Sequence, residues 1–379
     1  MAATLNTTVI QNASSSTANI TLDTAGNVTG GANLVATGMP YGSSSFLRNR
    51  IINGGMQVAQ YGTSVTPTNL NFTYAMDRFF CALNAGTSGF TVTQLNQANT
   101  ALSGFYNAFR YQRNSGQTST TTMAFGQTIE TSNCYDLAGQ SVTLSFYARA
   151  GSNFSAASSQ ITARIATGSG VDQGSNSAYN GTWTGYAQTN TVITVTTSWV
   201  RYTVTVSIPS GTNEIQVLFY WAGTGTAGTN DYLDVTGVQL EQGSVATPFE
   251  RPLYSKQLAD CQRYYYAWVF GSTDFQELVA RTSTTGFDIT TYLPVTMRTQ
   301  PSLVNPAGGT AYGSIVGYDS TYSALRANVT AMTVQTSQSY SAIHLACTNA
   351  TMTQSQSQGS ASWDTAVNNS TGMGFSAEL

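Results

Sequence analysis

The stretch Trp199-Val-Arg-Tyr-Thr-Val-Thr-Val-Ser-Ile208 alternates apolar and polar side chains along its whole length. A period of two indicates a β-strand with one buried face. Residues 141–149, 214–221 and 232–240 alternate in the same way, and Gly, Asn or Pro punctuates the intervals between them. Many short strands separated by turns are typical of an antiparallel β-sandwich, so we expect an all-β fold of the jelly-roll kind.

The composition favours the same fold class. Only 8% of the residues are charged, Lys256 is the single lysine, and tyrosines outnumber phenylalanines by 21 to 16. Long amphipathic helices need charged residues on their solvent faces, whereas Thr and Tyr favour strands and Gly and Asn favour turns. The composition therefore excludes a helical bundle. A hydrophobic content of 41% also excludes a chain that is disordered throughout.

The chain divides into four segments by pattern. Residues 1–46 have no aromatic residue before Tyr41 and too little apolar area for a core of their own. They form an extended N-terminal arm, which is either a flexible linker or packs against copies of itself or another protein. Residues 47–252 are expected to form the sandwich, residues 253–266 a helical linker, and residues 267–379 a second, smaller β domain at the tip.

Charge and cysteine content limit the partners. The net charge of −3 and the pI near 5.1 argue against electrostatic binding of nucleic acid. No apolar run approaches the roughly 20 residues that span a bilayer, so no membrane insertion is expected. The four cysteines, at positions 81, 134, 261 and 347, lie too far apart for a zinc motif. We expect them to be buried, reduced thiols in a chain that folds in a cytoplasm.

The sequence offers little catalytic chemistry. His344 is the single histidine and lies in an alternating strand, and no G-x-S-x-G motif supplies a nucleophile. Asp231 and Asp234 are three residues apart, which places them on opposite faces of a strand and disfavours a catalytic pair. Either could instead contribute to a Ca²⁺ site. No phosphate-binding or dinucleotide motif is present. We therefore expect no enzymatic activity and no cofactor, and we assign no metal site.

Four aromatic residues beside Gly-rich loops are the candidate ligand-binding residues: Trp183, Tyr186, Tyr220 and Trp221. Aromatic rings on the loops of a β-sandwich can stack on sugar rings, and nearby amides can bond sugar hydroxyls. The alternative is that these rings are buried in the core or in a subunit interface, as large aromatic side chains often are. The sequence leaves both alternatives open.

Two blocks resemble a known family. The first is Arg48-Asn-Arg-Ile-Ile-Asn-Gly-Gly-Met-Gln-Val-Ala-Gln-Tyr-Gly-Thr63, which is followed by Tyr74–Phe79. The second is Val235-Thr-Gly-Val-Gln-Leu-Glu-Gln-Gly-Ser-Val-Ala-Thr-Pro-Phe-Glu-Arg251, which continues to Cys261–Tyr265. Together they resemble bacteriophage tail-fibre and related virion fibre proteins. The ending Gly374–Leu379 is similar to the end of that family.

The resemblance implies a jelly-roll domain similar to carbohydrate-binding modules, in a homotrimeric fibre. It also implies that Asn53–Met56 forms a first strand beside the last, Val235–Leu240, and it supplies no catalytic residues. We expect a structural virion protein, assembled in the host cytoplasm, that is anchored to other tail or capsid proteins through residues 1–46 and contacts host surface glycans. The alternatives are a capsid decoration or head-fibre protein and a tailspike-type polysaccharide depolymerase.

Overall fold

The computed structural model describes residues 9–10, 20–22, 28–30, 48–67, 72–84, 88–96, 101–268, 275–281, 286–304, 314–318, 324–335, 342–349, 359–364 and 373–379. The chain forms two compact units, Met1–Leu47 and Arg48–Leu379. The first contains a three-stranded antiparallel sheet of β1 (Val9–Ile10), β2 (Ile20–Leu22) and β3 (Val28–Gly30). Its boundary lies next to the expected end of the N-terminal arm.

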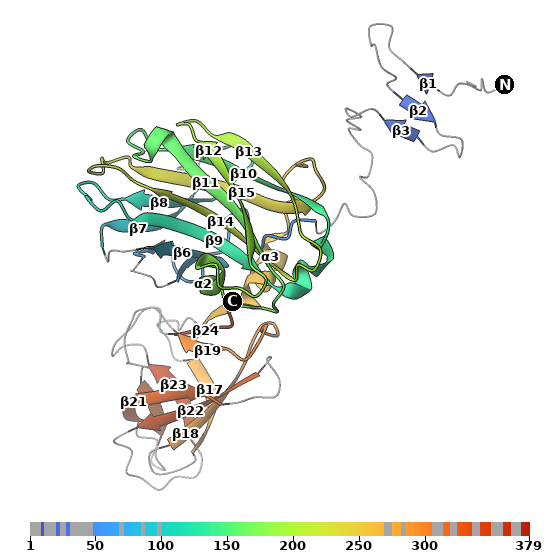
Figure 1. Ribbon diagram of the computed structural model, residues 1–379. Helices are drawn as coiled ribbons and strands as arrows, with labels where there is room; N and C mark the ends of the chain where they lie inside the picture. The colour runs from blue at the N-terminus through green and yellow to red at the C-terminus, as the bar shows by residue number, and fades with distance from the viewer. Residues whose placement is uncertain are drawn as a thin grey trace, which may run out of the picture. The chain divides into compact units, whose positions relative to one another are not determined.

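The second unit contains the expected antiparallel β-sandwich, made of two six-stranded sheets (Figure 1). The first sheet has the order β13 (Val200–Ser207), β10 (Ser141–Ala150), β15 (Tyr232–Gln242), β8 (Ala108–Arg113), β7 (Phe90–Leu95) and β4 (Ser64–Val65). The second has the order β12 (Ala187–Thr194), β11 (Gln160–Gly168), β14 (Glu214–Ala222), β9 (Thr122–Ile129), β6 (Phe79–Leu83) and β5 (Thr73–Met76). The all-β prediction is confirmed.

The core lies between the two sheets, because successive residues of a strand point to opposite faces and one face of each sheet meets the other sheet. Central strands such as β9 and β15 are buried on both faces along most of their length. Four phenylalanines from both sheets form its centre. The ring centroids of Phe109 and Phe125 are 4.5 Å apart, those of Phe125 and Phe219 are 5.0 Å apart, and those of Phe146 and Phe219 are 4.6 Å apart. All four are fully buried. Contacts between strands so distant in sequence hold the two sheets face to face.

The segment that follows the arm lies beside β15, as the resemblance implied, but it is not a strand. Residues 51–55 form turns. Val238 donates its amide to the Gly54 carbonyl at 2.9 Å, and Arg50 donates its amide to the Leu240 carbonyl at 2.8 Å. Asn53 has a φ of +61°, and its side chain bonds backbone atoms of Gln57 and Val58. The turns thus replace the expected Asn53–Met56 strand.

The residues expected to form one C-terminal β domain divide into two structures. After helix α3 (Tyr254–Gln262), β16 (Tyr265–Trp268), β24 (Met373–Ser376) and β19 (Ser302–Val304) make a three-stranded sheet in the order β16-β24-β19. The other strands close a six-stranded barrel. They are β17 (Phe275–Arg281), β18 (Gly286–Tyr292), β22 (Ala342–Asn349), β21 (Ala324–Val334), β20 (Ser314–Tyr318) and β23 (Gly359–Asp364).

The last residues of the chain therefore do not belong to a terminal tip. They return to the sandwich, where Tyr74 donates its hydroxyl to the Leu379 carbonyl at 3.2 Å and Arg78 forms a buried ion pair with Glu378. Arg298 donates to the carbonyls of Ala377 and Glu378. The barrel is thus inserted between paired strands, which corrects the expected boundary of the 267–379 domain.

Asp77, between β5 and β6, has a fully buried carboxyl group. Both carboxyl oxygens accept hydrogen bonds from Gln60 at 2.6 Å, one from its backbone N–H and one from its side-chain amide. Burial raises the pKa of Asp77 from 3.8 to about 6, although the bonds from Gln60 partly oppose that shift. The native state therefore binds this proton more tightly than the unfolded state.

The stability contributed by Asp77 is thus complete below pH 4 and is lost as the pH rises through about 6. Replacing Asp77 by Asn removes the titration. From pH 4 to pH 7 we expect the wild type to lose on the order of 3 kcal/mol of unfolding free energy relative to Asp77→Asn. Urea unfolding of both proteins across this range measures it, and a difference independent of pH would contradict the assignment.

Candidate functional site

The four aromatic residues singled out from the sequence lie in different environments. Trp221 is 5% exposed and belongs to the core, where its ring packs against Tyr111 and Phe125. Trp183 is 3% exposed and donates its ring N–H to the Gly174 carbonyl at 3.2 Å. Neither tryptophan ring can stack on a sugar in this arrangement, so burial, the alternative left open by the sequence, holds for these two residues.

Tyr186 and Tyr220 lie near each other on the outer face of the second sheet. Both are half-buried, and the guanidinium carbon of Arg164 lies 5.9 Å from the centre of the Tyr220 ring. Burial raises the pKa of Tyr186, while the nearby Arg164 opposes that shift. The Tyr186 hydroxyl donates to the Gln188 side chain at 2.6 Å. Sugar binding by these two tyrosines stays a prediction.

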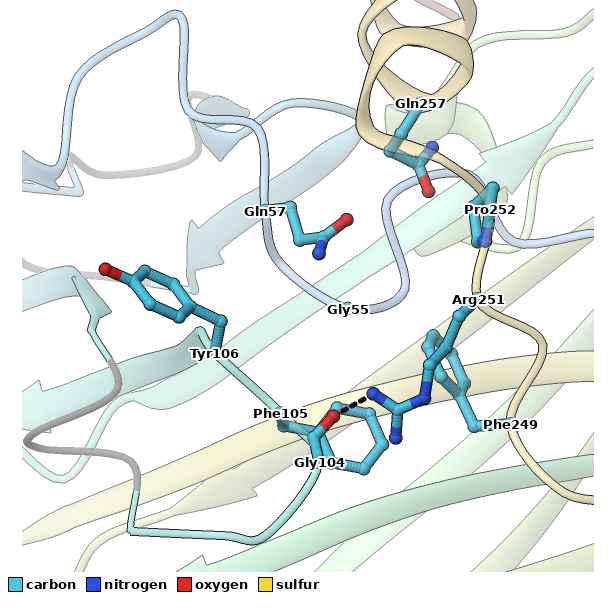
Figure 2. A pocket seen from close by; sticks show the side chains of 9 residues that line it. All are labelled: Gly55, Gln57, Gly104, Phe105, Tyr106, Phe249, Arg251, Pro252 and Gln257. Carbon is cyan, nitrogen blue, oxygen red and sulfur yellow. Dashed lines mark hydrogen bonds between the residues drawn. The ribbon is translucent and has the colours of Figure 1, made fainter.

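A pocket that the sequence did not indicate combines an exposed aromatic ring with several polar groups (Figure 2). Three segments far apart in the sequence line it: the turns after the arm, the loop before β8, and the connection from β15 into α3. Its lining residues are Gly55, Gln57, Gly104, Phe105, Tyr106, Phe249, Arg251, Pro252 and Gln257. Figure 2 shows the amides of Gln57 and Gln257 and the guanidinium of Arg251 directed toward the same hollow.

Two aromatic rings, tilted against each other, form the base of this pocket. The ring centroids of Phe105 and Phe249 are 5.2 Å apart, and the guanidinium carbon of Arg251 lies 4.6 Å from the centre of the Phe105 ring. Arg251 also donates to the Gly104 carbonyl. Gly104 has a φ of +83°, and a Cβ there would lie 2.8 Å from an Arg251 nitrogen. The positive φ favours glycine where the loop meets the arginine.

A hydrogen bond to the backbone holds the loop that carries Gln57. Gln94 donates its side-chain amide to the Met56 carbonyl at 2.7 Å, which fixes the loop that carries Gln57. Gln257 is 5% exposed and projects from α3, whereas Tyr106 is 61% exposed. None of the lining residues carries a carboxyl, imidazole or thiol group. The pocket can therefore stack a ring and bond hydroxyls, and its lining has no pair of carboxyl groups.

Asp231 and Asp234, the acids considered for Ca²⁺, are each held by arginines. Asp231 accepts from Arg113 at 2.9 Å and from the Ser155 hydroxyl at 2.6 Å. Asp234 accepts from Arg110 and Arg149 at 2.7 to 2.9 Å. Their separate partners agree with the prediction that they face opposite ways. Among the described residues, no three His, Cys, Asp or Glu side chains gather as metal ligands.

The described cysteines are buried. Cys81, Cys134 and Cys261 are buried free thiols, as predicted, whereas the side chain of Cys347 lies outside the described residues. Within the described ranges, every helix is too short or too polar to cross a bilayer.

Comparison with known proteins assigns no family. No family model matches the chain, and no curated protein does so. A crystal structure of the enzymatically active domain of tailspike protein 4 from bacteriophage CBA120 is similar at 15% identity and a TM-score of 0.32. The match covers 52% of this chain and 22% of that chain.

Two other structures show a comparable degree of similarity. One is described as a sugar-binding protein from Bacteroides thetaiotaomicron VPI-5482, at 14% identity, with 52% of this chain and 100% of that chain covered and a TM-score of 0.31. The other is TmCBM61 in complex with β-1,4-galactotriose, at 12% identity, with coverage of 52% and 99% and a TM-score of 0.30. Scores this low do not establish a shared fold. The β-sandwich assignment depends on the pairing of this chain's own strands.

Proposed function

We propose that this chain is a structural fibre protein of a bacteriophage virion and that its sandwich binds glycans on the host surface. The virion assignment is supported by the two blocks that resemble fibre proteins, Arg48–Thr63 and Val235–Arg251. Both blocks contribute to the pocket, because the first supplies Gln57 and the second supplies Phe249 and Arg251. The arrangement of this pocket is the observation that carries the glycan-binding proposal.

A pyranose ring has apolar C–H faces and a rim of hydroxyl groups. The exposed ring of Tyr106 offers a surface for the C–H face. The exposed amide of Gln57 can donate to or accept from sugar hydroxyls, and the guanidinium of Arg251 can donate to them. Ligand sites combine apolar and aromatic contacts with a small number of well-placed polar groups that fix orientation. The pocket supplies both kinds of contact.

The same composition favours binding over hydrolysis. Glycoside hydrolysis ordinarily requires two carboxyl groups on either side of the scissile bond, and the lining of this pocket has none. We therefore propose that the protein is not an enzyme. Residues 1–46 would attach it to tail or capsid proteins, and a homotrimer would present three pockets. Weak single contacts would then be strengthened by multivalent attachment.

Replacing Tyr106 by Ala should weaken binding to host envelope polysaccharide by about tenfold, because tyrosines are enriched among the few interface residues whose truncation costs more than about 1 kcal/mol. Tyr135→Ala is the matched control, since both tyrosines are 61% exposed and only Tyr106 lines the pocket. Surface plasmon resonance of each variant on immobilised polysaccharide measures the effect. Both variants should keep the wild-type melting temperature.

Two outcomes would contradict the proposal. Equal binding by wild type and Tyr106→Ala would show that the pocket does not take part in glycan recognition. Release of reducing sugar ends during incubation would instead favour the depolymerase alternative. Electron microscopy of virions labelled on this chain would decide between a tail fibre and a capsid fibre.

A further inference from the structure

A row of charged residues crosses the outer face of the first sheet, away from the core. Arg149 on β10 pairs with Asp234 on β15, and Asp234 pairs in turn with Arg110 on β8. Trp199 directly precedes β13. The first residue of β13, Val200, pairs with Ala148, which is next to Arg149. The four side chains thus come from adjacent strands and lie in line across the sheet.

The carboxylate at the centre of this row is completely buried, and two arginines share it. Arg110 donates to Asp234 through two nitrogens at 2.7 and 2.9 Å, and Arg149 donates through one at 2.8 Å. The arginine side chains retain 22% and 17% exposure. Since one carboxylate cannot neutralise two guanidinium groups, the row carries a net positive charge at the surface of an acidic protein.

A third arginine on the same face adds to this charge. Arg201 on β13 pairs with Tyr147 on β10, two residues from Arg149. It donates to the Ser145 hydroxyl at 3.0 Å and to the Thr247 carbonyl, which are both uncharged acceptors. The middle of the face therefore holds three guanidinium groups and the Asp234 carboxylate. Glu241, further along β15, accepts from Thr247 and is paired with a fourth arginine, Arg48, so the face keeps its excess of positive charge.

Aromatic rings hold these guanidinium groups in fixed positions. The guanidinium carbon of Arg110 lies 3.5 Å from the centre of the Tyr232 ring, and that of Arg149 lies 4.9 Å from the centre of the Trp199 ring. Arg201 lies 5.9 Å from the centre of the Tyr147 ring. Stacking of this kind orients the planar donors before a ligand arrives, which reduces the entropy lost on binding.

The arginine face continues into the pocket. The ring of Tyr147 lies 5.1 Å from that of Phe105, which forms the base of the pocket. Gly237 has a φ of +62°, and a Cβ there would lie 2.7 Å from the Phe105 ring and 3.0 Å from the Tyr147 ring. The glycine thus lets these two rings approach the strand. A chain of sugars seated in the pocket can extend over Tyr147 toward the three arginines.

We propose that this face, which we call the arginine face (Arg110, Arg149 and Arg201), selects acidic polysaccharides whose repeating units carry carboxylate or phosphate groups. This inference rests on the proposed glycan-binding function and names the class of glycan. Guanidinium groups match carboxylate and phosphate oxygens in geometry and charge. The pocket supplies contacts that any sugar could use, and the arginine face supplies the contacts that require an anion.

The test compares polygalacturonate with the same polymer after chemical reduction of its carboxyl groups. We expect wild type to bind the acidic polymer about tenfold more tightly than the reduced one at 50 mM salt, and this preference should shrink at 500 mM salt because exposed charges are screened. A glycerol-phosphate teichoic acid serves as the phosphate arm. Tighter binding of one polymer identifies the anion that the face prefers.

The variant Arg201→Gln separates charge from folding, since its acceptors are uncharged and no buried carboxylate is left unpaired. It should lower affinity for the preferred acidic polymer about three- to tenfold and leave affinity for reduced polygalacturonate unchanged. Arg149→Gln should act in the same direction if its melting temperature is retained. Equal binding of acidic and reduced polymers by wild type would overturn the inference and leave glycan binding intact, whereas binding of neither would also refute the proposed function.

Discussion

Replacing Arg78 by Met should destabilise the sandwich by about 3 to 5 kcal/mol, because it leaves the buried carboxylate of Glu378 without its partner. The arginine side chain is 2% exposed and that of Glu378 is 6% exposed. Arg78 also donates to the Thr128 carbonyl at 2.6 Å, and its guanidinium carbon lies 3.6 Å from the centre of the Tyr264 ring. One side chain therefore joins the returning C-terminal segment to β9 and to the end of α3.

Lys256→Met is the control, because it also removes one cation from an ion pair. Lys256 bonds Asp260 at 2.6 Å, but the two side chains are 46% and 31% exposed. An exposed pair of this kind contributes less than about 1 kcal/mol. Urea unfolding of both variants measures the contrast. Adding Glu378→Gln to Arg78→Met should recover part of the loss, since the uncompensated charge is then absent. A loss in Arg78→Met no larger than in Lys256→Met would show that the ion pair does not hold the C-terminal segment.

The strands with strong alternation could be predicted closely from the sequence. The stretch 214–221 became β14 (Glu214–Ala222), and 232–240 became β15 (Tyr232–Gln242). The helix expected over 253–266 is shorter, at Tyr254–Gln262. These elements depend on local periodicity, which is visible in one sequence.

The barrel could not be predicted because its closure depends on long-range pairing. Phe275 on β17 pairs with Trp363 on β23, and Tyr265 on β16 pairs with Ser376 on β24. Strand order is set by which edges meet in space, and no local pattern records it. A C-terminal domain was therefore expected where the chain makes an insertion and then returns.

The site was missed for a related reason. The pocket combines Gln57, Tyr106 and Arg251, which come from three separate segments, and none of these residues forms a motif with its neighbours. Trp221, in contrast, could have been assigned to the core. It follows Phe219 by two residues in an alternating strand that also places Val217 on the buried face. Proximity to a Gly-rich loop was weaker information than this alternation.

Gly54→Ala is the other substitution for which we expect a large effect, a loss of about 3 kcal/mol or more, or failure to yield soluble protein. A Cβ at Gly54 would lie 2.0 Å from the Val238 carbonyl oxygen and 3.1 Å from its carbon. Both are backbone atoms of a central strand, so neither can move without disturbing β15. The hydrogen bond from the Val238 amide to the Gly54 carbonyl, at 2.9 Å, would be lost as the two segments separate.

The adjacent residue provides the control for this prediction. A Cβ at Gly55 would meet the Phe249 ring at 3.6 Å and the Gln57 side chain at 3.8 Å, which are ordinary van der Waals contacts. Gly55→Ala should therefore change the free energy of unfolding by less than about 1 kcal/mol, in either direction. Because the two glycines are neighbours, a difference between their variants cannot come from the general cost of replacing glycine in this segment. Thermal and urea unfolding of both proteins give the comparison. Similar stability of the two variants would mean that the turns after the arm are not held against β15 as tightly as the Gly54–Val238 contact implies.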